Sequence, residues 1–382
     1  MLLLPGCLSL SEYFFILLNL LFYMGLLRFL LACGVVIGHS DGILGYTPLA
    51  GDLAVQCFYI ISGFYMALIL NEKYTGKQSL YVFYTNRALK IYPLYWIVLL
   101  LRVVYAFIVL YFGYPGTLTH YAETWPLPAS SLTFLIVTNV FIFGLDWYFF
   151  LGIKNDGALF FTKDGMTRNV KVYDMAFNFI AWTISLELLF YLFAPFIVRK
   201  KPTFIILILL ISLIIRLVLI QNNLTEAPWN YMFFPAQIMF FMAGILAYHM
   251  YTYLLKYPIK SKITEYGILL VITLIVLFYY RFFQESYLKQ IFLFISITLS
   301  IPVLFKLTKA YNWDRWLGNL SYPIYITQIL FLKLLPAKSI PKVIDLGFTT
   351  LICTILLSIT LDYLVTKPLE RIRQSRATKL IH

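Results

Sequence analysis

Charged residues are scarce in this sequence: Asp, Glu, Lys and Arg make up 12% of its 382 residues, about half of the share found in a soluble domain. Hydrophobic residues make up 61%. So few charges cannot cover the surface of a water-soluble globular protein of this length. The composition instead indicates a polytopic membrane protein.

Cysteine and histidine are also few, with four residues of each. The cysteines show no short repeated spacing, which excludes both a disulfide framework and a zinc-finger pattern. The histidines have no ligand-like partners nearby in the sequence, so no metal site is predicted.

No Lys or Arg precedes Arg28, so a cleaved signal peptide would lack its positive region. The first apolar run, Leu10 to Gly38, is too long for one ordinary span and too short for two. We therefore interpret residues 1–23 as an apolar extension. A membrane domain is predicted over 24–366, followed by a basic cytoplasmic tail over 367–382.

Long apolar runs are abundant, and they do not alternate polar with apolar residues as the strands of a membrane β-barrel do. The sequence therefore predicts an all-α integral membrane bundle of about ten transmembrane helices, each long enough to cross a bilayer. The first span follows Arg28, and the others lie near 52–70, 91–112, 175–198, 203–220, 231–255, 263–280, 290–305, 317–335 and 343–365.

A further apolar segment, 131–152, is interrupted by Asn139, Gly144 and Asp146. If it does not cross, the segments assigned to the inside carry eighteen Lys and Arg and those outside carry eight. This satisfies the positive-inside rule, which a full crossing would invert for everything downstream. We interpret 131–152 as a re-entrant or interfacial segment on the outer side, with both chain ends on the cytoplasmic side of the plasma membrane.

The net charge of +13 would suggest nucleic acid as the partner of a soluble protein. Here the basic residues fall mainly in short connections between apolar runs. That pattern indicates contact with anionic membrane lipids and no nucleic-acid partner.

Arg28 and His39 place a cation and an imidazole in otherwise apolar sequence, eleven residues apart. On an α-helix this is about three turns, so both side chains leave the same face, roughly 16 Å apart along the axis. Ionisable residues inside a span usually point into the protein and serve a function. The alternative is that Arg28 snorkels to the surface and His39 only caps a helix.

Glu187 is the acid placed deepest in a predicted span. A carboxylate at that depth needs a cation or hydrogen-bond donors. His39 is a candidate partner, since a carboxylate bonded to an imidazole supports it as a base. The alternative is a structural role between helices, against Arg102 or Arg216.

Arg87 and Lys90 lie three residues apart, with Pro93 just after them. The spacing puts both cations on one face of a helical turn, and a proline early in a helix leaves the first N–H groups free for an anion. We expect a phosphate-bearing ligand at the cytoplasmic surface. The alternative is an ordinary positive-inside flank.

Five segments together resemble the acyltransferase-3 family of polytopic membrane O-acyltransferases. They are Arg28 with His39, Phe58 with Ile60–Phe64, Arg87 with Lys90–Trp96, Trp182–Glu187, and the LGNLSYPIYITQ segment from Leu317. The resemblance implies a ten-span fold that uses cytoplasmic acyl-CoA, with acetyl as the expected group, and no permanently bound cofactor. The implied acceptor is a hydroxyl of an extracytoplasmic carbohydrate, such as a surface polysaccharide or its lipid-linked precursor.

The same resemblance assigns roles to the residues. The catalytic residues are His39, as the base, with Glu187 and Arg28. The donor-binding residues are Arg87, Lys90, Tyr92 and Trp96. Direct transfer and a relay through an acyl-enzyme are both compatible with these residues.

Two positions depart from the family pattern. Lys90 stands where a second Arg is usual, which keeps the charge but loses bidentate phosphate geometry. Gln328 stands where a His often ends the late motif, which removes a possible extra base.

The rival function is a transporter or flippase for a lipid-linked sugar, with Arg28, Glu187 and Arg216 along its path. Such transporters often show paired, interrupted repeats, and this sequence has none. The sequence does not indicate an oligomeric state.

Overall fold

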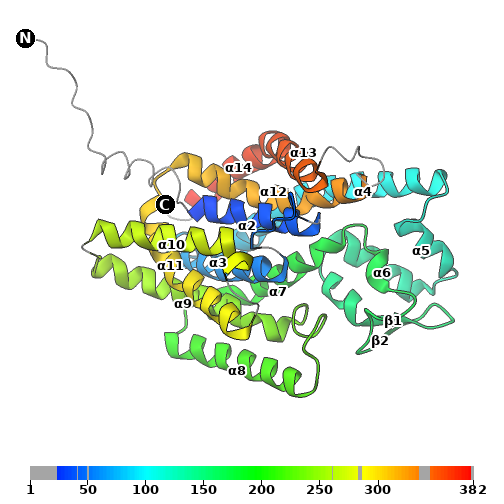
Figure 1. Cartoon of the computed structure of the whole chain (residues 1–382), viewed down its shortest axis with the longest axis horizontal. Coiled ribbons are helices and arrows are strands. Elements are labelled where there is room, and N and C mark those ends of the chain that lie inside the picture. Colours follow the sequence, from blue (N-terminus) through cyan, green and yellow to red (C-terminus); the bar gives the residue numbers. More distant parts are fainter. Residues whose placement is uncertain are drawn as a thin grey trace, which may run out of the picture.

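The computed structural model describes residues 24–40, 42–49, 51–259, 261–282, 286–334 and 345–379. The predicted apolar extension, 1–23, lies outside the described residues. The described chain is helical almost throughout, and its longest helices run side by side along the long axis of the molecule (Figure 1).

Ten helices stand where the ten spans were predicted, so the predicted all-α membrane bundle is confirmed. They are α2 (Met24–His39), α3 (Gly51–Glu72), α4 (Ser79–Tyr111), α7 (Trp182–Ile197), α8 (Pro202–Gln221), α9 (Phe234–Lys256), α10 (Lys262–Phe282), α11 (Tyr287–Thr308), α12 (Asn312–Leu334) and α13 (Leu346–Leu361).

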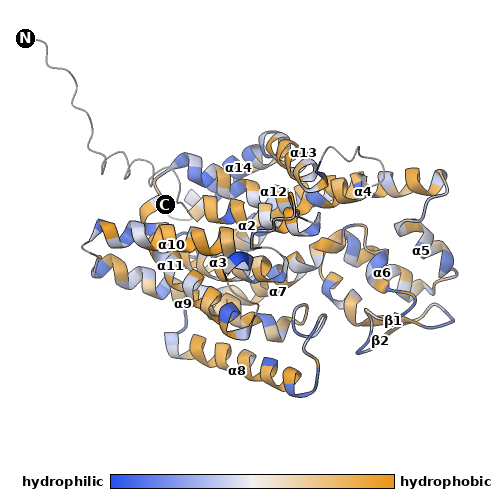
Figure 2. Ribbon diagram, in the orientation of Figure 1, coloured by the Kyte–Doolittle hydropathy of each residue, from blue (hydrophilic) through white to orange (hydrophobic). Residues whose placement is uncertain are grey.

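Eight helices of the described chain are long and apolar enough to cross a membrane. Figure 2 shows the contrast between α8, which is apolar along its length, and the polar α14 (Lys367–Thr378) near the C-terminus. The other two predicted spans, α2 and α12, are not among the eight. These two helices also contribute charged residues to the bundle interior, which the site below explains.

The remaining elements form one region between α4 and α7, and a short C-terminal stretch. The region comprises α5 (Thr117–Glu123), α6 (Ala129–Phe141), the 3₁₀ turns Leu145–Phe150, Val172–Met175 and Phe179–Ala181, and a two-stranded sheet. Strand β1 (Leu151–Ile153) pairs antiparallel with β2 (Leu159–Phe161), Leu151 opposite Phe161. A π-helical turn, Asp362–Thr366, joins α13 to α14.

Helix α6 has 13 residues, about 20 Å of helix and too short for a bilayer core of about 30 Å. Its C-terminal end leaves carbonyl groups without helical partners, and side chains of α4 satisfy them. Tyr92 donates to the carbonyl of Phe141 at 2.8 Å, Trp96 to that of Val140 at 2.9 Å, and Tyr95 to that of Asn139. Because these donors lie in the middle of α4, α6 ends beside the middle of that helix, as the re-entrant interpretation of 131–152 requires.

The segments that charge counting assigned to one side gather at one end of the bundle. Arg199, after α7, donates to the carbonyls of Leu70 and Tyr74 near the end of α3. Met24, at the start of α2, donates to the hydroxyl of Thr308 at the end of α11. At the other end, Trp229 donates to the carbonyl of Lys163. The chain therefore has the connectivity that a non-crossing 131–152 requires.

Two polar stretches at the basic end are helical. Helix α4 begins at Ser79, twelve residues before the apolar run that predicted this span. The segment interpreted as a tail folds into α14 and packs on α4, where Arg376 donates to Thr85 at 2.8 Å. Both stretches are polar enough to escape a search for apolar runs, yet each has a face that packs on the bundle.

Close approach of α3 and α9 depends on two glycines. A Cβ placed on Gly63 would overlap the backbone of Phe241, and one on Gly244 would overlap the backbone of Ile60. Small residues at such contacts let two helix backbones touch inside a membrane. This contact fixes α3, which lines the site along its whole length.

Candidate functional site

A cavity of about 420 Å³, called here the first cavity, lies inside the bundle at its basic end. Helices α2, α3, α4, α7, α12 and α14 all contribute to its lining. Its charged residues are the cations Arg28, Lys73, Arg87, Lys90, Lys309 and Arg315, and the acids Glu72, Glu187, Asp314 and Glu370. Six cations against four acids give an interior with excess positive charge, suited to an anionic ligand.

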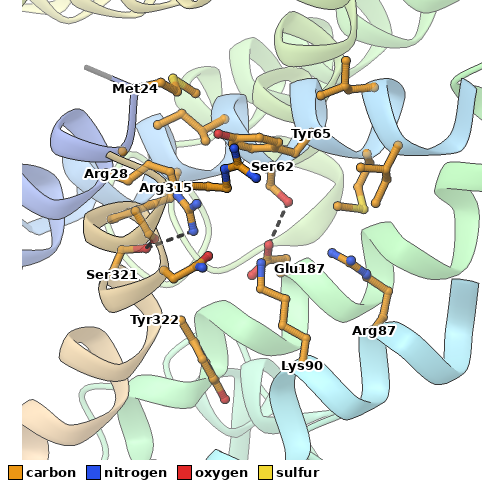
Figure 3. A pocket seen from close by; sticks show the side chains of 18 of the residues that line it. Met24, Arg28, Ser62, Tyr65, Arg87, Lys90, Glu187, Arg315, Ser321 and Tyr322 are labelled. Carbon is orange, nitrogen blue, oxygen red and sulfur yellow. Dashed lines mark hydrogen bonds between the residues drawn. The ribbon is translucent and has the colours of Figure 1, made fainter. Parts of the chain in front are cut away.

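Arg28 points into this cavity (Figure 3). Its guanidinium donates to the hydroxyl of Ser321 on α12 at 3.0 Å and lies 5.5 Å from the centre of the Tyr65 ring. Helices α2 and α12 approach closely here, since a Cβ on Gly318 would lie 2.9 Å from the Cα of Gly25. These contacts hold Arg28 within the bundle, in place of the snorkelling alternative.

Arg87 and Lys90 lie on the face of α4 that lines the cavity, as their spacing predicts. Arg87 is buried between the rings of Phe83 and Tyr191, each 5.9 Å from its guanidinium carbon. Within the described chain neither cation forms an ion pair or hydrogen bond. Both charges are therefore available to a ligand.

The helix-terminus part of the Arg87 and Lys90 prediction was wrong. Pro93 lies inside α4, far from its first residue, Ser79. The N–H groups around Arg87 and Lys90 are therefore bonded within the helix and cannot meet an anion. Binding there depends on the two side chains.

Glu187 lies among these cations (Figure 3). Its carboxylate accepts from the hydroxyl of Ser62 on α3 at 2.7 Å and from the hydroxyl of Tyr191, one turn along α7. Two hydroxyl donors satisfy the carboxylate without a salt bridge.

The predicted pairing of Glu187 with His39 was wrong, because the two residues line different cavities. The structural alternative is not seen either. Arg102 donates to the carbonyl of Phe177 at 2.8 Å, and Arg216 packs over the ring of Phe240.

A second cavity, of about 230 Å³, lies beyond the first along the same helices. His39 lines it, at the C-terminal end of α2. Half of the other residues that line it are aromatic: Phe149, Tyr173, Phe179, Trp182, Tyr231 and Tyr325. Phe149, Tyr173 and Phe179 come from the region between α4 and α7, so that region forms one wall of the cavity.

His39 contacts α12 through Gln328. Its Nδ1 lies 3.0 Å from Gln328 Oε1, and Gln328 Nε2 donates to the carbonyl of Tyr325 at 2.9 Å. Because the amide nitrogen of Gln328 already donates to Tyr325, the amide oxygen faces Nδ1 of His39. This oxygen accepts a hydrogen bond from the Nδ1–H group. His39 Nε2 is then left with its lone pair, as a base requires. Arg28 and His39 thus both face α12, which confirms their predicted common face.

The comparison with protein families decides what kind of protein this bundle is. The family model described as an acyltransferase domain, acyltransferase-3, matches residues 21–365, nearly the whole chain. The chain belongs to the acyltransferase-3 family. It is therefore a multi-pass membrane acyltransferase, and the rival interpretation as a transporter or flippase loses its support. Comparison with curated proteins and with solved structures gives no match.

The resemblance to the family implied that Tyr92 and Trp96 bind the donor. Neither lines the first or the second cavity, and both donate to the end of α6 as described above. Their contacts position the re-entrant helix, and no contact supports their predicted role in donor binding.

Sequence reasoning also missed two contributors to the site. Gln328 was taken as the loss of a base, and the structure makes it the partner of His39. Helix α14 supplies Glu370 and Gln374 to the first cavity, although its sequence looked like a solvated basic tail. Hydropathy gave no signal for α14, because the residue that this helix buries is itself charged, Arg373.

Replacing Gln328 with Leu is expected to lower the rate of acyl transfer about fivefold or more, since losing one buried hydrogen bond costs about 1 kcal/mol or more. Donor affinity should stay unchanged, because Gln328 lines neither cavity. Gln328→Glu keeps an acceptor for Nδ1 and should retain most activity. Thr327→Val, the neighbouring buried position, is the control. Equal rates for Gln328→Leu and the parent would contradict the orienting role.

Proposed function

We propose that this membrane acyltransferase moves an acyl group, with acetyl expected, from cytoplasmic acyl-CoA to a hydroxyl of a carbohydrate on the other side of the plasma membrane. One observation carries the proposal. A cavity rich in cations and a cavity that holds a histidine among aromatic rings lie end to end within the same helices.

The first cavity suits acyl-CoA because the pyrophosphate and 3′-phosphate of that molecule carry several negative charges. Arg87 and Lys90 line it without a contact ion pair in the described chain, although Glu187 and Glu370 line the same cavity. Arg binds phosphate through a planar fork and Lys through a point charge. Glu187 would balance the excess positive charge while Arg28 and Arg315 hold the opposite wall.

The second cavity suits a sugar because flat aromatic faces pack against the C–H groups of a sugar ring. Trp182 and Tyr231 meet there at right angles, with ring centres 4.7 Å apart. His39 lies beside them as the ionisable group. A hydroxyl held against these rings would be presented to His39 Nε2.

In the proposed reaction His39 Nε2 accepts the proton of the sugar hydroxyl, and the oxygen attacks the thioester carbonyl. The C–S bond breaks, the acyl–oxygen ester forms, and the thiolate of CoA leaves and takes up a proton. Direct transfer and a relay through a transient acyl-enzyme both remain compatible with these side chains.

The orientation proposed for the enzyme rests on charge. The bundle end that bears the first cavity also bears the segments richest in Lys and Arg, including α14. The positive-inside rule assigns this end to the cytoplasm, where acyl-CoA is made available.

Deleting the gene tests this function in the cell. Mass spectrometry of the surface polysaccharides is expected to show loss of one ester substituent. The ester should return with the parent gene and not with His39→Ala. Unchanged ester content of every surface carbohydrate in the deletion strain would contradict the proposed acceptor class.

A further inference from the structure

Two residues line both cavities: Val55 of α3 and Tyr325 of α12. The cationic cavity and the histidine cavity adjoin at the layer of side chains that includes these two residues. We call this layer the neck and define it as Val55, Tyr59, Thr183 and Tyr325. Of these four, Tyr325 was named above in the lining of the second cavity, and the other three have no role so far.

The order of residues along each helix places the neck between Glu187 and His39. On α7, Trp182 lines the second cavity, whereas Thr183 and Glu187 line the first. On α3, Gly51 lines the second cavity and Ser62, the partner of Glu187, lines the first. A group passing from the cations to His39 must therefore pass the neck.

Tyr59 follows Val55 by one helical turn and lies on the same face of α3. Its side chain lines the first cavity, is only 3% exposed, and stacks on Phe241 with ring centres 4.7 Å apart. The hydroxyl has no hydrogen-bond partner among the described residues. A buried hydroxyl left unpaired is unfavourable, so its proton is free to be donated to an oxygen atom of a ligand.

Tyr325 reaches the neck from the opposite side. Its hydroxyl accepts from Thr183 at 2.8 Å and donates to the carbonyl of Ile180 at 3.3 Å, which is a long contact. The carbonyl of the same residue accepts from Gln328, the partner of His39. Tyr325 thus joins the neck to the proposed base.

We propose that the neck is the point of acyl transfer and that the Tyr59 hydroxyl donates a hydrogen bond to the acyl carbonyl oxygen. This inference rests on the proposed function. As the sugar oxygen attacks, negative charge develops on that carbonyl oxygen, and a fixed donor lowers the barrier. Tyr59 keeps its proton throughout. The thiolate departs into the first cavity, and the ester is formed in the second.

The first test is Tyr59→Phe, assayed for turnover and for acyl-CoA binding in purified protein. Removing one such donor is expected to lower kcat by about 10²–10³-fold. The Kd for acyl-CoA should stay within about twofold, because the phosphates lie far from the neck. Tyr248→Phe on α9 removes a hydroxyl outside both cavities and serves as the control. Parent-like turnover of Tyr59→Phe would overturn the proposal.

The second test does not depend on activity. In a chain whose native cysteines are replaced, Val55→Cys in sealed proteoliposomes should react with a small membrane-impermeant thiol reagent supplied from either side. Met66→Cys should react from the first-cavity side alone, and Val35→Cys from the second-cavity side alone. Labelling of the Val55→Cys variant from one side alone would contradict the proposal that the two cavities meet at the neck, even if acyl-CoA proves to be the donor.

The two tests separate the neck from the proposed function. If the parent protein neither binds nor uses acyl-CoA, the proposed function fails, and two-sided labelling of the Val55→Cys variant still decides whether the neck joins the cavities. If the parent uses acyl-CoA and Tyr59→Phe is unimpaired, the neck proposal alone fails.

Discussion

Replacing His39 with Ala is expected to lower acyl transfer by about 10²–10⁴-fold, the usual contribution of a general base. His39 is the histidine that lines the second cavity, and Gln328 holds its ring by Nδ1. No other described histidine lines either cavity. The measurement is ester formation from acyl-CoA by purified protein in nanodiscs. Donor binding should be retained, because His39 is remote from Arg87 and Lys90.

The matched control for His39 is His249→Ala. His249 also lies in a membrane-spanning helix, α9, but lines neither cavity. Its variant should transfer acyl groups at the parental rate. Near-normal transfer by a well-folded His39→Ala protein would remove His39 from the mechanism.

Replacing Arg87 with Ala is expected to weaken acyl-CoA binding about tenfold or more. Charge-assisted hydrogen bonds to phosphate are worth about 1.5–3 kcal/mol each, and 1.4 kcal/mol is a factor of ten in Kd. Arg87 has no ion-pair partner within contact distance in the described chain, so a phosphate of the proposed donor would take that place. Titration of purified protein with acyl-CoA measures the change. Lys90→Arg should preserve or improve affinity, because it adds a planar fork.

Arg216→Ala is the control for the donor site. Arg216 is a cation within the apolar α8, but it packs over Phe240 and lines neither cavity. Its loss should leave donor affinity unchanged. If Arg87→Ala binds acyl-CoA as tightly as the parent, Arg87 and Lys90 are only a positively charged flank and the donor binds elsewhere.

The sequence predicted the membrane bundle because apolar runs and charge counts act at the scale of whole helices. The re-entrant interpretation of 131–152 came in the same way, from the count of Lys and Arg on the two sides of the membrane. The polar first turns of α4 and the whole of α14 were not predicted as packed helices. They contact the bundle through a few side chains, and hydropathy averaged over a window does not detect these.

The site was predictable along each helix and less so between helices. Arg28 and His39 share a face because helical periodicity fixes it, and their contacts with α12 confirm this. Pairing of His39 with Glu187 would require the two side chains to lie at the same level along the bundle axis. That level depends on how far α2 and α7 are shifted relative to each other along this axis. Gln328 and the hydroxyl of Tyr59 gain their significance only from packing that no spacing rule describes.

The central claim is transfer across the membrane, and the most direct measurement uses inverted membrane vesicles. Acyl-CoA labelled in its acyl group is added to the exposed cytoplasmic face, and the carbohydrate acceptor is sealed inside. We predict labelled ester on the enclosed acceptor and none on acceptor added outside, with the signal lost in His39→Ala. Labelled ester on the outer acceptor alone would contradict the account.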